Sequence, residues 1–131
     1  MLSPGQFEVN EAWVLFRLNS RPIPTELDGN FDCVTFSDAA SGILLCTELL
    51  CVEEPEAWPT QADHLLQLAF RRHKRFPKTI LAAKGVLADL IRPEAARQGI
   101  DVIPLAANQL LVFSSEPRQA FAKQFERRSR R

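Results

Sequence analysis

The stretch FDCVTFSDAASGILLCTELLCV, residues 31–52, decides the fold of this chain. Its two ends, 31–37 and 43–52, are rich in β-branched, aromatic and aliphatic residues, which favour strands. The residues between them are small and polar and include Gly42, as is typical of a tight connection between antiparallel strands. The sequence therefore predicts a β-hairpin here.

The segments on either side of the hairpin have different compositions. Residues 11–19 (EAWVLFRLN) have the composition of an earlier strand. Residues 21–30 contain two prolines, an Asp-Gly pair and an Asn, so we expect a surface loop there. After the hairpin, residues 53–59 hold two prolines and three glutamates and predict a linker over the surface.

A helix is predicted over residues 60–72, because apolar residues recur there at the spacing of one helical stripe. The stripe consists of Ala62, Leu65, Leu66 and Ala69. Thr60 and Asp63 resemble a capping box with Asp in the usual Glu place, which favours a helix start at this point.

Two short strands and two more helices complete the pattern. Residues 78–83 form an apolar run that favours a buried parallel strand, and 100–105 form another. The helix between them starts after Gly85, and Pro93 either kinks it or opens a second helix. Residues 116–131 predict a last helix with Phe121 and Phe125 facing inward and a frayed basic tail at 126–131.

The order of elements predicts one α/β domain over residues 1–131. A length of 131 residues is close to the commonest domain size. Three strands followed by alternating helices and strands predict a mixed five-stranded sheet, with three antiparallel and then two parallel strands and with helices packed on it.

Composition and charge narrow the class of protein. The hydrophobic fraction of 46% and charged fraction of 24% are typical of globular domains. No apolar run is long enough to span a membrane, and the first ten residues do not resemble a secretory signal, so we expect a cytoplasmic protein. The net charge of zero divides into minus nine over residues 1–65 and plus nine over 66–131. This asymmetry favours a polar partner, self-association as a dimer included.

The cysteines and histidines give no clear metal or redox motif. Cys33, Cys46 and Cys51 are an odd number without a C-x-x-C spacing, and we expect reduced strand residues. A cross-strand disulfide between Cys33 and Cys46 is the alternative that the hairpin leaves open, although a cytoplasmic setting opposes it. His64 and His73 have no nucleophile context nearby. The sequence implies no cofactor and no metal.

Three short stretches resemble a known fold. Residues 36–43 (FSDAASGI) resemble the second hairpin of retroviral and transposon integrase cores, 76–85 (FPKTILAAKG) resemble their Pro-Lys to Ser-Asp-Asn-Gly segment, and 98–100 (QGI) match a Gly-Ile step into the last strand. With the order of elements, these stretches resemble the RNase H-like fold. The chain also resembles a family of uncharacterised bacterial domains with the same hairpin and Gly-Ile step, for which no activity is implied.

This sequence differs from the catalytic members of that fold at the positions of their metal-binding carboxylates. RNase H-like enzymes hold two metal ions with carboxylates from the first strand, the fourth strand and the last helix. The first position falls at Phe16 or a neighbour, and the second at Ala83 beside Lys84, so neither is acidic. For the last helix, Glu116 and Glu126 are the candidates. We therefore expect no catalytic residues and, as the leading hypothesis, a non-catalytic binding or interaction domain.

Two alternatives remain at this point. Asp32, Asp38 and Glu48 lie on or near the hairpin and could form a displaced metal site in a nuclease. The simpler interpretation is that Asp32 and Glu48 face solvent and that Asp38 supports the turn by bonding its backbone.

The second alternative is a nucleic-acid-binding module that uses the basic half of the chain. Its candidate residues form one cluster in the predicted first helix and one near the end of the chain: Arg71, Arg72, Lys74 and Arg75, and Lys123, Arg127, Arg128, Arg130 and Arg131. The simpler interpretation is that the first cluster complements a helix dipole and the second is a solvated tail.

Overall fold

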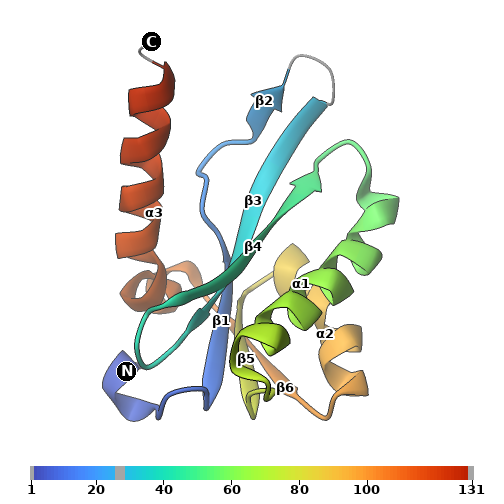
Figure 1. Cartoon of the computed structure of the whole chain (residues 1–131), viewed down its shortest axis with the longest axis vertical. Coiled ribbons are helices and arrows are strands. Elements are labelled where there is room, and N and C mark those ends of the chain that lie inside the picture. The colour runs from blue at the N-terminus through green and yellow to red at the C-terminus, as the bar shows by residue number, and fades with distance from the viewer. Residues whose placement is uncertain (1, 26–28, 130–131) are drawn as a thin grey trace.

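The computed structural model describes residues 2–25 and 29–129, with all of their side chains except those of Thr25 and residues 125–129 (Figure 1). The strands are β1 (Ala12–Arg17), β2 (Ile23–Thr25), β3 (Gly29–Asp38), β4 (Leu44–Cys51), β5 (Thr79–Ala83) and β6 (Asp101–Leu105). The helices are α1 (Trp58–His73), α2 (Val86–Arg97) and α3 (Ala107–Ser129), and the 3-10 turns are η1 (Pro4–Gln6) and η2 (Pro55–Ala57).

The strands form one mixed, open sheet in the order β4-β3-β1-β5-β6. β1 and β4 pair antiparallel with β3, whereas β1 pairs parallel with β5 and β5 parallel with β6. The short β2 pairs with the start of β3, where Ile23 lies opposite Phe31. The other edge of β3 at Phe31 is already paired with Cys51 of β4. β2 therefore lies on the same edge of β3 as β1. The α/β class, the hairpin and the mixed sheet that the sequence predicts are confirmed.

The two faces of the sheet carry separate cores, because side chains alternate along each strand. Trp13 and Leu15 of β1 point to the face covered by α1 and α2, where they join one buried cluster. Val14 and Phe16 point to the other face and pack with Phe113 of α3. Figure 1 shows α1 and α2 side by side and α3 standing apart from them.

Several predicted boundaries are wrong. The loop predicted over 21–30 contains β2 and the start of β3, which makes six strands instead of five. α1 begins at Trp58 rather than residue 60, with Pro59 in its first turn, so part of the predicted 53–59 linker is helical and the Thr60–Asp63 capping box does not exist. Proline fits the first turn because the amide it lacks has no helical partner there.

The largest difference between the predicted and the observed elements is the start of the last helix. α3 begins at Ala107, nine residues before the predicted start, and it passes through Pro117. Leu110, Phe113 and Phe121 lie on one side of it and pack against the sheet, so tertiary packing decides its extent. The backbone stays helical to Ser129 in the predicted frayed tail, while the side chain of Phe125 and residues 130–131 lie outside the described part.

The structure also decides between the alternatives for Pro93 and for the cysteines. α2 is a single helix through Pro93. The three cysteines are free, and the disulfide alternative is wrong, because Cys33 lies opposite Leu49 and Cys46 opposite Phe36. None of the helices within the described residues combines the length and apolar character needed to cross a membrane.

Candidate functional site

The carboxyl ends of β1 and β5 form the point of the sheet where a ligand site is expected. The two strands are parallel neighbours, with Leu15 beside Ala82. From its end β1 leads back to β2 and β3, whereas β5 leads through α2 to β6 on the other side. In open α/β sheets, strands that diverge in this way leave a crevice beyond their carboxyl ends.

A cleft of about 390 Å³ lies at this place, and we call it the β1–β5 cleft. Its walls come from four strands or strand ends, from the starts of α1 and α2 and from α3. The lining residues are Arg17, Asp32, Val34, Leu50, Trp58, Ala83, Lys84, Val86, Leu87, Leu110 and Arg118. Three of these side chains are cationic and one is anionic.

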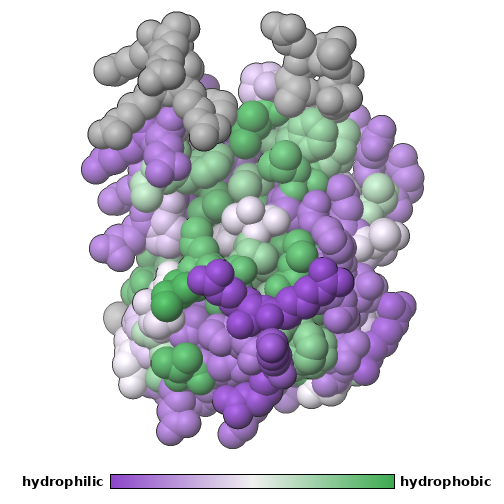
Figure 2. Space-filling model, viewed as in Figure 1, coloured by the Kyte–Doolittle hydropathy of each residue, from purple (hydrophilic) through white to green (hydrophobic). Residues whose placement is uncertain are grey.

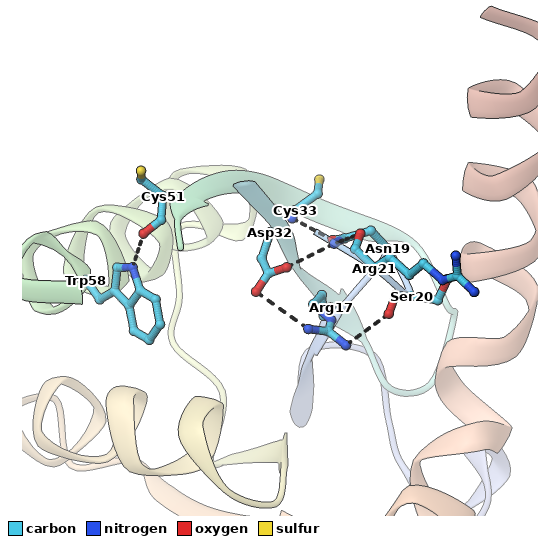
Figure 3. A network of polar contacts seen from close by, with 8 residues as sticks. All are labelled: Arg17, Asn19, Ser20, Arg21, Asp32, Cys33, Cys51 and Trp58. Carbon is cyan, nitrogen blue, oxygen red and sulfur yellow. Dashed lines mark hydrogen bonds and ion pairs between the residues drawn. The ribbon is translucent and has the colours of Figure 1, made fainter. Parts of the chain in front are cut away.

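Arg17 and Asp32 form the polar side of the cleft (Figure 3). Arg17 Nη1 lies 3.6 Å from Asp32 Oδ2, and its Nη2 donates to the backbone oxygen of Ser20 at 3.4 Å. Asp32 Oδ1 accepts from Asn19 Nδ2 at 3.0 Å. Because Arg17 is 41% exposed and its contacts are long, solvent screens the pair and its guanidinium stays accessible to a ligand.

Asn19 fixes the chain that leaves β1. Its amide nitrogen also donates to the backbone oxygen of Arg21 at 2.7 Å, and its oxygen accepts from the Cys33 amide at 2.7 Å. The side chain is nearly buried, at 5% exposure for the residue. From the sequence, Asn19 was only the last residue of the predicted strand over 11–19, since spacing alone does not show that one side-chain amide serves three partners.

Trp58 forms the opposite side of the cleft. Its indole nitrogen donates to the backbone oxygen of Cys51 at 2.8 Å, which ties the first turn of α1 to the end of β4. Figure 3 shows the indole extending from α1 into the space that the side chains of Arg17 and Asp32 also enter from the other side. Val34, Leu50 and Leu87 make the neighbouring wall apolar.

Lys84 and Arg118 bring two further positive charges. Lys84 follows β5, and its backbone amide donates to Leu105 at 2.9 Å, so the end of β6 holds this residue in place. Arg118 comes from the middle of α3. Neither side chain forms an ion pair with any side chain that the structure describes. Their charges are therefore not neutralised from within this part of the chain.

The residues that the sequence resemblance assigned to metal-ligand positions lie in different surroundings. Phe16 is fully buried on the α3 face, and Ala83 lies in the wall of the β1–β5 cleft next to Lys84. Glu116 is exposed and borders a different cleft beside α3, and the side chain of Glu126 lies outside the described part. The sequence-based assignment of these positions therefore identifies no carboxylate in the cleft.

The other carboxylates are engaged separately. Asp38 is almost fully buried and accepts from the amides of Asn10 and Ser41, as expected for a residue that supports the turn. Glu48 Oε2 is hydrogen-bonded to His64 Nδ1 at 2.7 Å. Asp32 and Asp38 are six residues apart on β3, a separation of about 20 Å in a strand. Among the described residues, no three His, Cys, Asp or Glu side chains are grouped as metal ligands.

The predicted basic clusters lie apart from the cleft and from each other. Arg71, Arg72, Lys74 and Arg75 are exposed at the carboxyl end of α1, which leads to the amino end of β5. Arg127 and Arg128 belong to the last turns of α3, at the far end of the long axis (Figure 1), and their side chains lie outside the described part together with residues 130 and 131. The structure thus brings no described side chains of the two clusters onto one surface.

The thiols are protonated at neutral pH. Burial raises the pKa of Cys46 to about 11, and burial also raises the pKa of Cys33. A thiol with a raised pKa is a poor nucleophile, because the thiolate is the reactive form. Neither residue has the environment of a catalytic cysteine.

A larger groove of about 790 Å³ runs between α3 and the β3–β4 hairpin. Figure 2 shows apolar side chains gathered along this side of the molecule. Its polar wall is formed by the Asp38–Gly42 turn, where the Asp38 carboxylate is occupied by Asn10 and Ser41. The α3 side of the groove adds the polar residues Ser115, Glu116 and Gln124 to its apolar surface.

No protein-family model matches the chain, and no curated protein matches it in sequence.

Proposed function

We propose that this chain is an RNase H-like domain that binds a ligand or partner without metal-dependent catalysis. The order of the sheet supports the RNase H-like part: an antiparallel trio, β4-β3-β1, is followed by the parallel strands β5 and β6. The helices support it too, because α1 and α2 connect these strands on one face and α3 packs on the other.

The observation that carries the proposal is the lack of converging carboxylates at the carboxyl ends of β1 and β5 among the described residues, where Arg17 and Lys84 lie next to Phe16 and Ala83. Two-metal chemistry requires carboxylates that converge on both ions. Here Arg17 and Lys84 border the cleft, and the single carboxylate, Asp32, is paired with Arg17. Positive side chains repel Mg²⁺ and attract anions, so this cleft is built for binding a negatively charged group.

The experiment is thermal unfolding of the whole chain with and without Mg²⁺ or Mn²⁺. We expect both ions at millimolar concentration to change the melting temperature no more than Na⁺ at equal ionic strength. Stabilisation by several degrees that Asp32→Asn or Asp38→Asn abolishes would overturn the proposal, because it would establish a metal site. Nucleic-acid cleavage lost in the same variants would do so as well.

A second candidate function is nucleic-acid binding through the end of α1. It is favoured by four exposed cationic residues that form no ion pair with a described side chain: Arg71, Arg72, Lys74 and Arg75. A titration of the same samples with short single- and double-stranded nucleic acids at low salt tests it. Replacing the three arginines together, Arg71→Glu, Arg72→Glu and Arg75→Glu, would abolish such binding, whereas Arg92→Glu on α2 is the control.

A further inference from the structure

The charge of the β1–β5 cleft differs from that of the whole chain. The chain as a whole is neutral, yet the described residues that line the cleft include Arg17, Lys84 and Arg118 with one acidic side chain, Asp32. These described residues give the cleft a net charge of plus two. Lys84 and Arg118 have no carboxylate partner among the described side chains, so most of this charge is available to a ligand.

The backbone at the start of α2 adds to this positive field. Gly85 precedes the helix with a φ of 106°, a conformation that favours glycine, and no side chain caps the first turn. The free N–H groups of the first turn and the helix dipole both favour an anion. Val86 and Leu87 of this turn line the cleft, whereas the acidic residue of the turn, Asp89, does not.

The remaining wall of the cleft is apolar and aromatic. Val34, Leu50 and Leu87 line it together with the indole of Trp58, whose nitrogen is already bonded to Cys51. This wall has no free polar group to offer. An occupant that fills the cleft therefore has a charged end beside Arg17 and Lys84 and an apolar body beside Trp58.

We propose that the β1–β5 cleft binds a phosphomonoester that carries an apolar or aromatic substituent. A phosphomonoester has a charge of about −1.5 to −2 at pH 7, which matches a cleft of plus two, whereas a phosphodiester has only a single charge. The volume of about 390 Å³ is within the range of small-molecule sites. The inference rests on the proposed function, because a metal bound here would change both the charge and the ligand.

The first experiment is a titration of the ¹⁵N-labelled whole chain, at about pH 7 and moderate salt, with phenyl phosphate, inorganic phosphate and dimethyl phosphate. We expect phenyl phosphate to shift the backbone amides of Val86 and Leu87 and the indole N–H of Trp58. Inorganic phosphate binds more weakly because it leaves the apolar wall empty, and dimethyl phosphate binds most weakly because it has one charge.

Variants that change the charge of the cleft test whether the phosphate binds to its cationic side chains. Lys84→Gln and Arg118→Gln each weaken phenyl phosphate binding about tenfold, since each removes a charge-assisted contact. Lys78→Gln is the matched control, because Lys78 is exposed just before the opposite end of β5 and leaves binding unchanged. Asp32→Asn tightens binding about threefold, because it removes the one negative charge among the described residues of the cleft and releases Arg17.

The inference would be overturned by the absence of shifts at the cleft, by an equal loss of affinity in Lys78→Gln and Lys84→Gln, or by weaker binding in Asp32→Asn. Binding of a 5′-phosphorylated oligonucleotide in the cleft without binding of phenyl phosphate would also overturn it. Stabilisation by Mg²⁺ or Mn²⁺ would instead refute the proposed function, so the two failures are distinguishable.

Discussion

The face of the sheet under α1 and α2 differs from the face under α3 in how completely its apolar side chains are covered. Among the described residues, sixteen buried residues form one cluster on the first face and nine form the cluster on the second. Trp13 packs against Phe36 with ring centroids 5.6 Å apart on the first face. On the second, Leu111 and Val112 of α3 are about half exposed, and two grooves border the helix.

This difference assigns separate roles to the two faces. The continuous core under α1 and α2 fixes the strands, and through them the positions of Arg17 and Lys84 at the β1–β5 cleft. The face under α3 contributes less burial and leaves apolar surface accessible. Since stability follows the apolar area removed from water, most of it should come from the first face.

The largest expected effect compares matched leucines on the two faces. Leu66→Ala on α1 removes a fully buried side chain and should lower the free energy of unfolding by about 3 kcal/mol. Leu110→Ala on α3 removes a half-buried side chain and should cost about 1 kcal/mol. Urea denaturation measures both. Equal losses would show that the α3 face is as important to stability as the other.

The next effect concerns a buried hydrogen bond at the edge of the first core. The indole of Trp13 donates to Asn10 Oδ1 at 2.6 Å, and Asn10 has a φ of 65°. Asn10→Gly should cost about 2 kcal/mol because it leaves a buried donor unpaired. Asn10→Ala should cost about 1 kcal/mol more, since alanine is strained at a positive φ. Chemical denaturation of the two variants separates the two contributions, and identical stabilities would contradict the assignment.

The elements with strong local patterns could be predicted from the sequence. The β3–β4 hairpin, the α1 stripe and both parallel strands follow from alternation, helical spacing and turn residues, within one or two residues of their ends. The first half of α3 could not, because the residue before it, Ala106, is not one of the preferred N-cap types. Its apolar side chains become interpretable only when the sheet face that they cover is known.

The sequence did not locate the β1–β5 cleft. Phe16, Ala83 and Lys84 could be matched to metal-ligand positions from the resemblance alone, and their neighbours in the chain marked the ends of two strands. The cleft is also lined by Arg118, which lies in a helix, and by Trp58, which lies in the segment predicted as a linker. These residues are far apart in sequence, so no spacing rule connects them. The basic runs that spacing does reveal, such as Arg71 and Arg72, lie elsewhere.

The smallest expected effect lies outside both cores. Glu53 accepts from the backbone amide and the side-chain amide of Asn30 at 2.9 and 3.0 Å, which holds the chain after β4 against the start of β3. The bond from the Asn30 amide lowers the pKa of this carboxyl below its ordinary value of 4.5. Because the folded-state pKa is the lower one, the contribution to stability is complete above about pH 4.5 and is lost as the pH falls further.

Glu53→Gln should therefore remove a small part of the pH dependence of stability without changing either core. Denaturation midpoints for the variant and the parent chain should differ slightly at pH 7 and converge toward pH 3. Glu54→Gln is the matched control, because the neighbouring carboxyl is exposed and forms no ion pair or hydrogen bond to a described side chain. A difference that persists at low pH would mean that Glu53 stabilises the fold by packing rather than by its charge. A large effect at pH 7 would mean that this exposed contact rivals the burial of Leu66, contrary to the dominance of the α1 and α2 face.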